Sequence, residues 1–487
     1  MKTGTLISLA AYFILMLAIG LYAWRKSTED SEGYLLGGRN LSPSVTALSA
    51  GASDMSGWLL LGLPGALYAA GLVEAWIGIG LFVGALVNWI VVAPRLREQT
   101  EARGNALTIP EFLANRFPDK AIALRVVSAV VIVVFFAVYT ASGMVAGGKL
   151  FETGLSAAVS GWGDPYIAGL WITAGVVLAY TMVGGFLAVS LTDFVQGIIM
   201  LVALVLMPLV VMFGPGGASG ASIAAVPQEG FLSLTHGLTL VGFLSAVTWG
   251  LGYFGQPHII VRFMAIRSVK DVPAARNIGM GWMGVCLLGA IGVGLAGRAY
   301  VERNNMVLED PETIFIVLAD LLFHPLITGF LLAALLAAVM STISSQLLVA
   351  SSSLTEDFYR LFLRKQASER EAVNIGRLSV LLVALAAIAI AYDRDSQVLG
   401  LVSNAWAGFG AAFGPLIVLS LTWDRMTGAG ALAGLVTGAA VVMAWIALGW
   451  SASFMGGPGV YEIIPGFVAA WLAIWGVSLV TGKRRVA

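Results

Sequence analysis

Long apolar stretches alternate with short polar ones along the whole chain. Each has about 20 residues or more, the length with which a helix crosses about 30 Å of hydrocarbon. Helix is the expected conformation, because lipid offers no hydrogen-bond partners to the backbone. The pattern predicts about thirteen membrane-spanning helices, at residues 5–24, 43–70, 73–93, 123–148, 166–185, 190–213, 237–255, 275–297, 325–352, 374–392, 397–422, 428–449 and 461–481.

The segments between these helices are short. The largest loops, near 95–120, 214–236 and 300–324, leave no room for a separate soluble domain, so residues 1–487 are expected to form one transmembrane domain. The first apolar run, 5–24, ends directly in Arg25 and Lys26 without a cleavage site of small residues. It is therefore expected to be a retained helix and not a signal peptide.

Composition supports a membrane protein and excludes several functions. Apolar residues make up 59% of the chain, charged residues 11%, and the mean hydropathy is +0.90. A soluble domain carries about 25% charged residues. Zero net charge gives no basic field for nucleic acid, and one cysteine, Cys286, excludes an intramolecular disulfide and a cysteine-built metal site. The three histidines are far apart, without metal or catalytic spacing, which argues against an enzyme.

The basic residues indicate how the chain is oriented. With the N-terminus outside and thirteen spans, 22 of the 27 Lys and Arg residues fall on the inner side. One missed span in the middle would spoil this asymmetry. The positive-inside rule therefore predicts a multi-pass protein of the cell (inner) membrane, with the N-terminus outside and the C-terminus in the cytoplasm.

Two of the predicted helices are interrupted by polar and glycine residues. The second contains the sequence SAGASDMSGW at 49–58, with the carboxylate of Asp54 deep in an apolar segment. An ionised Asp at mid-membrane costs at least about 2.5 kcal/mol on insertion scales. The cluster favours an unwound functional segment, although Asp54 capping the second half-helix is an alternative and compatible role.

The seventh predicted helix contains TWGLGYFGQP at 248–257, whose glycines and proline also favour unwinding. Trp249 and Tyr253 would share a face if this turn were helical. The alternative is a belt of aromatic residues at the membrane interface, because the segment lies near the inner end of the predicted span.

The two interruptions lie five spans apart, which indicates an inverted repeat. An odd separation gives two five-helix blocks of opposite orientation, each beginning with a broken helix. The blocks are 43–213 and 237–422, with 5–24, 428–449 and 461–481 as flanking helices. This arrangement is typical of secondary transporters.

A third polar cluster lies in the predicted helix 325–352. Ala338, Ser341 and Thr342 are spaced to lie on one face, where two hydroxyls and a carbonyl offer hard oxygen ligands. Carbonyls freed at the first interruption could complete a small cation site. Alternatively, the hydroxyls only bond back to the preceding turn.

At these residues the chain resembles the sodium:solute symporter family. The matching stretches are LGGR at 36–39, SAGASDMSGWLLLGLPGA at 49–66, YTMVGGFLAVSLTDFVQ at 180–196, WGLGYFGQPHIIVRFM at 249–264, and 337–357. They are long and spread over most of the chain. SDMSGW and WGLGYFGQPHI favour the proline-transporting branch.

The resemblance implies an all-α fold of the LeuT type with discontinuous helices, and sodium-driven uptake of L-proline with no cofactor besides Na⁺ as the coupling ion. It implies the following site residues. The sodium ligands are the carbonyls of Ala52, Met55 and Ala338 with the hydroxyls of Ser341 and Thr342; the substrate-binding residues are Ser56, Gly57, Tyr139, Trp249, Tyr253 and Pro257; the ion-coupling carboxylates are Asp54 and Asp193; and Arg39 lies at the inner gate.

Other functions remain open on the sequence. Asp54 could carry a proton in place of sodium, and another small amino acid-like solute could replace proline. A sensor built on a transporter fold or a passive channel would be a different class. The sequence does not indicate the oligomeric state.

Overall fold

The computed structural model describes residues 2–26, 31–214, 217–218, 220–364 and 366–482. Within these ranges the regular structure is helical, apart from one isolated bridge between Leu41 and Ile266. The principal helices are α1 Thr3–Lys26, α2 Ser31–Leu36, α3 Pro43–Asp54, α4 Leu63–Ala70, α5 Ala75–Ala102, α6 Ile109–Arg116, α7 Ala121–Gly154, α8 Pro165–Phe213, α9 Gly220–Ala224, α10 Leu240–Val247, α11 Pro257–Ala265, α12 Val272–Arg303, α13 Ile314–Leu322, α14 Pro325–Ser352, α15 Glu369–Ala391, α16 Val398–Thr422, α17 Gly428–Ala447 and α18 Ile463–Thr481.

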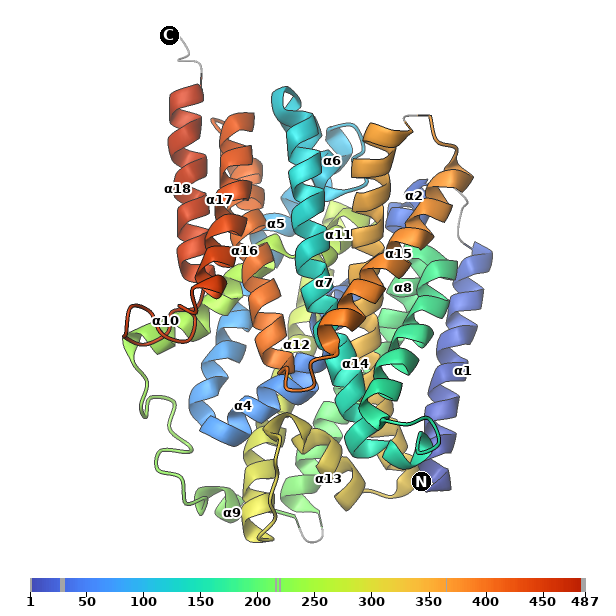
Figure 1. Ribbon diagram of the computed structural model, residues 1–487, viewed down its shortest axis with the longest axis vertical. Helices are drawn as coiled ribbons and strands as arrows, with labels where there is room; N and C mark the ends of the chain where they lie inside the picture. Colours follow the sequence, from blue (N-terminus) through green and yellow to red (C-terminus); the bar gives the residue numbers. More distant parts are fainter. Residues whose placement is uncertain (1, 27–30, 215–216, 219, 365, 483–487) are drawn as a thin grey trace.

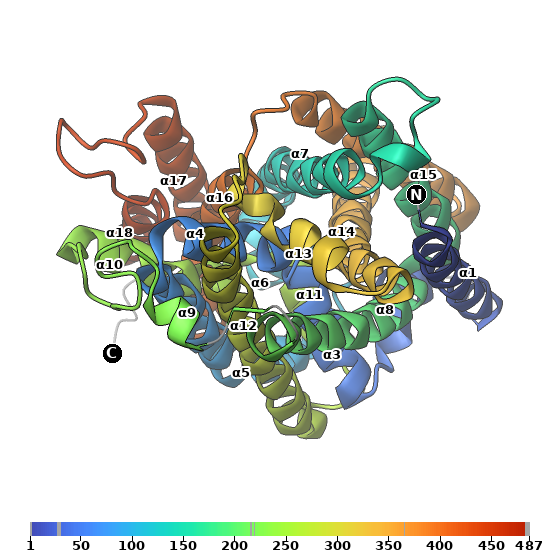
Figure 2. The ribbon, with the colours of Figure 1, turned by 90° about the horizontal axis from the view of Figure 1, so that it is seen from below.

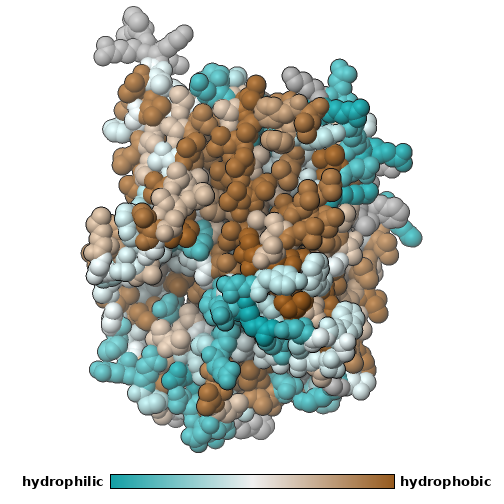
Figure 3. All heavy atoms as spheres, in the orientation of Figure 1, coloured by the Kyte–Doolittle hydropathy of each residue, from teal (hydrophilic) through white to brown (hydrophobic). Residues whose placement is uncertain are grey.

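Ten helices among the described residues are long and apolar enough to cross a membrane. The other three predicted spans coincide with shorter apolar helices, Trp58–Ala70, Pro165–Ala179 and Leu240–Gly255. In Figure 3 apolar residues cover the upper centre of the visible face, and hydrophilic residues gather at its upper right and across its lower half. The all-α membrane architecture expected from the hydropathy pattern is confirmed.

Helix starts follow local capping rules. Ser42 caps α3 by accepting the Val45 N–H at 3.4 Å, and Pro43 occupies the first helical position. Thr239 caps α10 in the same way, and Asp164 accepts two N–H groups at the start of α8. Because the first turn of a helix has N–H groups without internal partners, these side chains fix where each helix begins.

The helices pack into one bundle with flanking elements at two edges. α14 lies inside the bundle, against α7 and α8, whereas α1 packs on the outer side of α8 and α14. α17 and α18 pair with each other and with α16 at the opposite edge. The start of α1 and the end of α18 lie at opposite ends of the molecule in Figure 1. The division into repeats at 43–213 and 237–422 stays a prediction.

The structure corrects the sequence interpretation in the seventh span. We expected this helix to end at 255, with the interruption near its inner end. Instead a 3₁₀ segment, Thr248–Gly255, joins α10 to α11, and helical structure continues to Ala265. His258 and Arg262 lower the apparent hydropathy of α11, yet both are buried among other helices. The interruption is therefore in the middle of the span.

The three largest predicted loops also contain helices, and in 214–236 this helix is α9. α5 continues to Ala102 and α6 follows it, so little of 95–120 is irregular, and α13 lies within 300–324. These segments carry too many polar residues to read as apolar spans. α13 is nevertheless apolar along one side, where Ile314, Phe315 and Leu318 are buried.

Close backbone contact holds α5 against the 3₁₀ segment. A Cβ added at Gly84 would lie 2.2 Å from the Gly250 carbonyl oxygen, and one at Gly80 would lie 2.4 Å from that of Val247. Backbone atoms cannot move aside as a flexible side chain can. The second interrupted helix is thus positioned by glycines on its neighbour.

We expect Gly84→Ala to lower the free energy of unfolding by about 1–3 kcal/mol, because the new methyl group overpacks this contact. The measurement is thermal unfolding of the detergent-solubilised protein. Gly281→Ala on α12 is the matched control, since its Cβ would meet no atom within 4 Å. Equal melting temperatures for the two variants would contradict the close contact.

Candidate functional site

The first interrupted helix unwinds immediately after Asp54. The backbone leaves the helical region at Met55 (φ −80°, ψ 77°), and a π-helical turn, Trp58–Gly62, leads into α4. The Ser56 N–H donates to the Asp54 carbonyl at 2.9 Å. In an uninterrupted helix it would donate to Ala52, four residues earlier. The break therefore frees the Ala52 carbonyl for another partner.

That partner comes from α14. The Ser341 hydroxyl donates to the Ala52 carbonyl at 2.7 Å, and the Thr342 hydroxyl lies 3.5 Å from the same oxygen. Both hydroxyls also reach the Ala338 carbonyl, at 3.1 and 3.2 Å. Four of the five predicted sodium ligands thus lie together, on two helices that are distant in sequence.

Met55, the fifth predicted ligand, is buried at the break itself. The assembled donors are carbonyls and hydroxyls, the hard oxygen ligands that suit a small hard cation. No group of three or more His, Cys, Asp or Glu side chains suited to a metal is found among the described residues. The ligand roles of the five residues stay predictions.

Asp54 connects the two interrupted helices. One of its carboxylate oxygens, Oδ2, accepts a hydrogen bond from the Tyr253 hydroxyl of the 3₁₀ segment. Its backbone carbonyl accepts from Ser56, from the Trp58 indole at 3.1 Å and from the Tyr139 hydroxyl at 3.4 Å. The side chain that caps the second half-helix is Ser56, whose hydroxyl accepts the Trp58 N–H. Asp54 therefore holds Tyr139 and Tyr253 together at the break.

Trp249 and Tyr253 do not share a face. Trp249 stacks on Tyr461 with ring centroids 5.2 Å apart, whereas Tyr253 packs edge-on against Trp406 at 5.0 Å. The segment is a 3₁₀ helix with about three residues per turn, so side chains four apart diverge. Gly252 allows the segment to pack closely against Trp406, since a Cβ at this position would lie 1.9 Å from the Trp406 indole nitrogen.

A cavity of about 1170 Å³, here called the vestibule, reaches Trp249 from one end of the molecule. Its wall includes Lys149, which pairs with Asp310 at 2.8 Å and Glu312 at 2.7 Å. The Glu312 carboxylate also accepts the first N–H groups of α16, from Val398 and Leu399. The segment before α13 is thereby fastened to α7 and α16. Sequence reasoning missed this group, whose only signal was a lysine at the end of an apolar span.

The predicted substrate residues do not line a single cavity. Trp249 borders the vestibule, while Tyr139 and Tyr253 meet at Asp54. Gly57 packs so closely that a Cβ would lie 2.8 Å from that of Ala146. Pro257 lines a separate small cavity with residues including Leu35, Thr108 and Leu348. These six assignments stay predictions.

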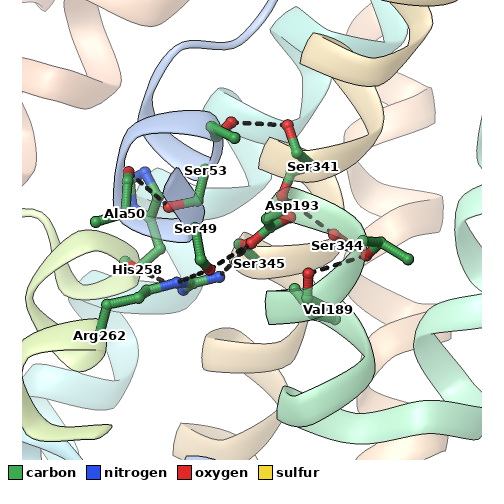
Figure 4. Close-up of polar contacts among 12 residues, drawn as sticks. Ser49, Ala50, Ser53, Val189, Asp193, His258, Arg262, Ser341, Ser344 and Ser345 are labelled. Carbon is green, nitrogen blue, oxygen red and sulfur yellow. Dashed lines mark hydrogen bonds and ion pairs between the residues drawn. The ribbon is translucent and has the colours of Figure 1, made fainter. Parts of the chain in front are cut away.

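Asp193 lies in a buried polar cluster that the sequence did not reveal. Arg262 of α11 donates to its carboxylate at 3.1 Å and to the Ser345 hydroxyl at 2.5 Å, while Ser49 donates to the same carboxylate at 2.8 Å (Figure 4). We expected Arg262 in an inner loop, but its side chain is only 1% exposed. The ion pair offsets the charge of both groups in the bundle and joins α3, α8, α11 and α14.

Arg39 fastens the end opposite the vestibule. Its guanidinium donates to the carbonyls of Ala106 at 2.6 Å and Met264 at 2.9 Å. The neighbouring Leu41 pairs with Ile266, and Arg97 of α5 donates to the Ile266 carbonyl at 2.6 Å. These contacts hold the end of α11 against α5 and the segment before α3.

Comparisons with known proteins support the resemblance over most of the chain. The model of the sodium:solute symporter family matches residues 34–438. The high-affinity proline transporter PutP of Bacillus subtilis strain 168 is 56% identical over 468 residues, covering 96% of each chain. The sodium/proline symporter of Staphylococcus aureus strain JH9 is 52% identical over 485 residues, covering 98% of this chain and 93% of that one.

Two solved structures share the fold. A Na⁺-coupled sialic acid symporter in a substrate-bound, outward-open state aligns with a TM-score of 0.80 over 98% of both chains, at 17% identity. Mhp1, a nucleobase-cation-symport-1 family transporter, aligns with a TM-score of 0.59 over 92% of this chain and 95% of that one, at 14% identity. The predicted LeuT-type fold is confirmed. Matched by the family model from residue 34 to 438 and more than half identical to relatives along nearly its whole length, the chain belongs to the sodium:solute symporter family.

Proposed function

We propose that this protein imports L-proline by sodium-coupled symport, with alternating access to a site at the two helix breaks. The observation that carries the proposal is the oxygen cluster of Ala52, Ala338, Ser341 and Thr342 beside the first break. The identity of the solute is supported by the two relatives, which are named as proline transporters.

Sodium would bind between α3 and α14. The Ser341 and Thr342 hydroxyls, which donate to carbonyls in this structure, would turn their lone pairs toward the ion. The ion would thereby tie the broken helix to α14. Proline binding and sodium binding then favour the same conformation, and each ligand raises the affinity for the other by the same factor. An inward membrane potential adds about 2.3 kcal/mol per charge for each 100 mV.

Proline would bind at the start of the second half-helix. Its carboxylate suits the N–H groups near Ser56 and Gly57, where the helix dipole favours negative charge. Its apolar ring suits an aromatic wall, which Trp249 offers beside the vestibule and Tyr139 with Tyr253 offers beside Asp54. No enzyme chemistry is required, because the solute leaves as it entered.

The conformation described here is proposed to face outward. Lys2 pairs with Asp320 at the end of α13, which places the N-terminus on the vestibule side. With the N-terminus outside, the vestibule opens to the exterior and the Arg39 contacts close the cytoplasmic end. Transport to the cytoplasm would require α11 to separate from α5 and from the segment before α3.

The proposed function predicts accumulation of labelled L-proline in proteoliposomes above equilibrium with an inward sodium gradient, and none with potassium in its place. The physical reason is that only sodium would fit the oxygen cluster and link the two gradients. Sodium-independent uptake that responds to a pH gradient would contradict sodium coupling. Uptake of other small amino acids in preference to proline would contradict the solute.

For the sodium site we expect Ser341→Ala and Thr342→Ala each to raise the half-saturating sodium concentration about tenfold or more, because each removes one hard ligand worth about 1.4 kcal/mol or more. Uptake is measured against sodium concentration at saturating proline. Ser420→Ala is the control, since its buried hydroxyl donates only to its own helix, at Ile417. An unchanged sodium dependence in both variants would place the ion elsewhere.

The proposed orientation can be tested by cysteine labelling. In a Cys286→Ala background, Val307→Cys should react with a membrane-impermeant maleimide added to intact cells, because Val307 is strongly exposed in the segment before α13. Asp424→Cys, exposed between α16 and α17, should react only after the cells are opened. The reverse pattern would mean that the N-terminus is cytoplasmic.

The location of basic residues supports this orientation, because several of them lie at the end of the molecule that is proposed to be cytoplasmic. Arg95, Arg103 and Arg116 lie at the end where Arg39 fastens α11, which is the proposed inner side. Lys365, Lys483, Arg484 and Arg485, which also count as inner in the sequence analysis, lie outside the described residues. The inner-membrane location of a protein with this orientation rests on the same charge asymmetry.

A further inference from the structure

Asp54 borders a third cavity, which no residue of α14 lines. This cavity has a volume of about 20 Å³ and lies between α3, α5, α11, α12 and the 3₁₀ segment. The lining residues with polar side-chain atoms are Asp54, Asn88, Trp89 and Tyr253, and the rest of the wall is apolar. None of the functions proposed above uses this space or assigns a role to Asn88.

Two polar acceptors that belong to this wall have no partner. Within the described part of the chain, neither Asp54 Oδ1 nor Asn88 Oδ1 accepts a hydrogen bond, although the two residues are only 2% and 1% exposed. The other carboxylate oxygen of Asp54 is taken by the Tyr253 hydroxyl. Buried acceptors are nearly always satisfied, and an unpaired one destabilises the fold. Two such atoms at one cavity indicate a ligand that donates twice.

The size and chemistry of the cavity select that ligand. A space of about 10–15 Å³ is enough for one water molecule, which needs two to four polar partners. A hard cation would gather about six oxygen ligands. Side-chain oxygens in this wall come from three residues, Asp54, Asn88 and Tyr253. Water fits the space, supplies two hydrogens and adds no charge of its own beside the apolar wall.

We propose that one buried water molecule bridges Asp54 Oδ1 and Asn88 Oδ1, and that Asn88 is thereby a positioning residue for the first helix break. The bridge ties the carboxylate of α3 to α5, and the Tyr253 hydroxyl ties it to the 3₁₀ segment. Ala52 and Met55, whose carbonyls are proposed to bind sodium, lie within two residues of Asp54. Holding the Asp54 side chain therefore fixes the direction of these carbonyls.

The predicted change in the half-saturating sodium concentration rests on the proposed symport, whereas the proposal of a bridging water molecule does not. Asn88→Ala removes one acceptor, and Asn88→Leu also fills the cavity. We expect both variants to raise the half-saturating sodium concentration about tenfold, which corresponds to about 1.4 kcal/mol. The maximal rate and the proline KM at saturating sodium should change less than about twofold, because Asn88 is not proposed to touch proline.

A matched control separates positioning from general destabilisation. Ser128→Ala removes another buried hydroxyl, on α7, that has no hydrogen-bond partner among the described residues, and should leave all three parameters unchanged. If Asn88→Leu does not reach the membrane, Asn88→Ser is measured in its place: its shorter hydroxyl leaves room for the water, so its sodium dependence should lie between wild type and Asn88→Ala. Unchanged sodium dependence in Asn88→Ala, or equal changes in sodium and proline parameters, would overturn the positioning role.

The water is tested independently of transport. An experimental structure at a resolution that shows ordered water should contain one density feature within hydrogen-bond distance of Asp54 and Asn88, which is lost in Asn88→Leu or, failing that, weakened in Asn88→Ala. Absence of this feature in the wild type would overturn the bridge. If the wild type shows the water but no sodium-driven uptake, the proposed symport fails while the bridge stands.

Discussion

A helix that stops in the middle of a membrane leaves backbone groups without partners, and the structure is organised around satisfying them. At the first break, the Ser56 N–H turns back to Asp54, which releases the Ala52 carbonyl to the Ser341 hydroxyl of α14. An unsatisfied backbone group in hydrocarbon costs several kcal/mol. The break therefore depends on α14, which supplies hydroxyl donors next to the freed carbonyl. A polar site inside the bundle is the direct result.

The second break depends on the same constraint but is satisfied differently. The 3₁₀ segment keeps local hydrogen bonds, while Trp406 donates to the Trp249 carbonyl at 2.7 Å and Gln256 donates to the Trp406 carbonyl at 3.1 Å. Glycines on both sides let the segment approach α5 and α16 closely. The Tyr253 hydroxyl then reaches Asp54 and joins the two breaks. Movement of one broken helix is therefore expected to be coupled to movement of the other.

Buried ion pairs join the helices toward both ends of the bundle. Asp193 with Arg262, and Asp357 with Arg125, join helices toward the end where Arg39 lies. Lys149 with Asp310 and Glu312 lies at the other end, where the vestibule opens. Removing one partner of such a pair would leave an uncompensated charge in the bundle, which is strongly destabilising. Alternating access is most simply understood as an exchange between the two sets.

The sequence by itself determined the number and order of the apolar segments, and with them the all-α fold, because lipid admits helices and little else. It also located the breaks, since SAGASDMSGW and TWGLGYFGQP interrupt apolar segments with polar, glycine and proline residues, and the family resemblance supplied candidate ligands. What only the tertiary structure decided is which freed groups meet. Arg262 was misplaced because a buried guanidinium and a loop arginine look the same in hydropathy. Trp249 and Tyr253 would share a face only in an α-helical turn, and spacing cannot tell such a turn from the 3₁₀ turn that forms. Asn88 gave no signal at all, since its proposed role depends on a cavity that tertiary packing forms between α3 and α5. The distances across such a cavity are not contained in a linear pattern.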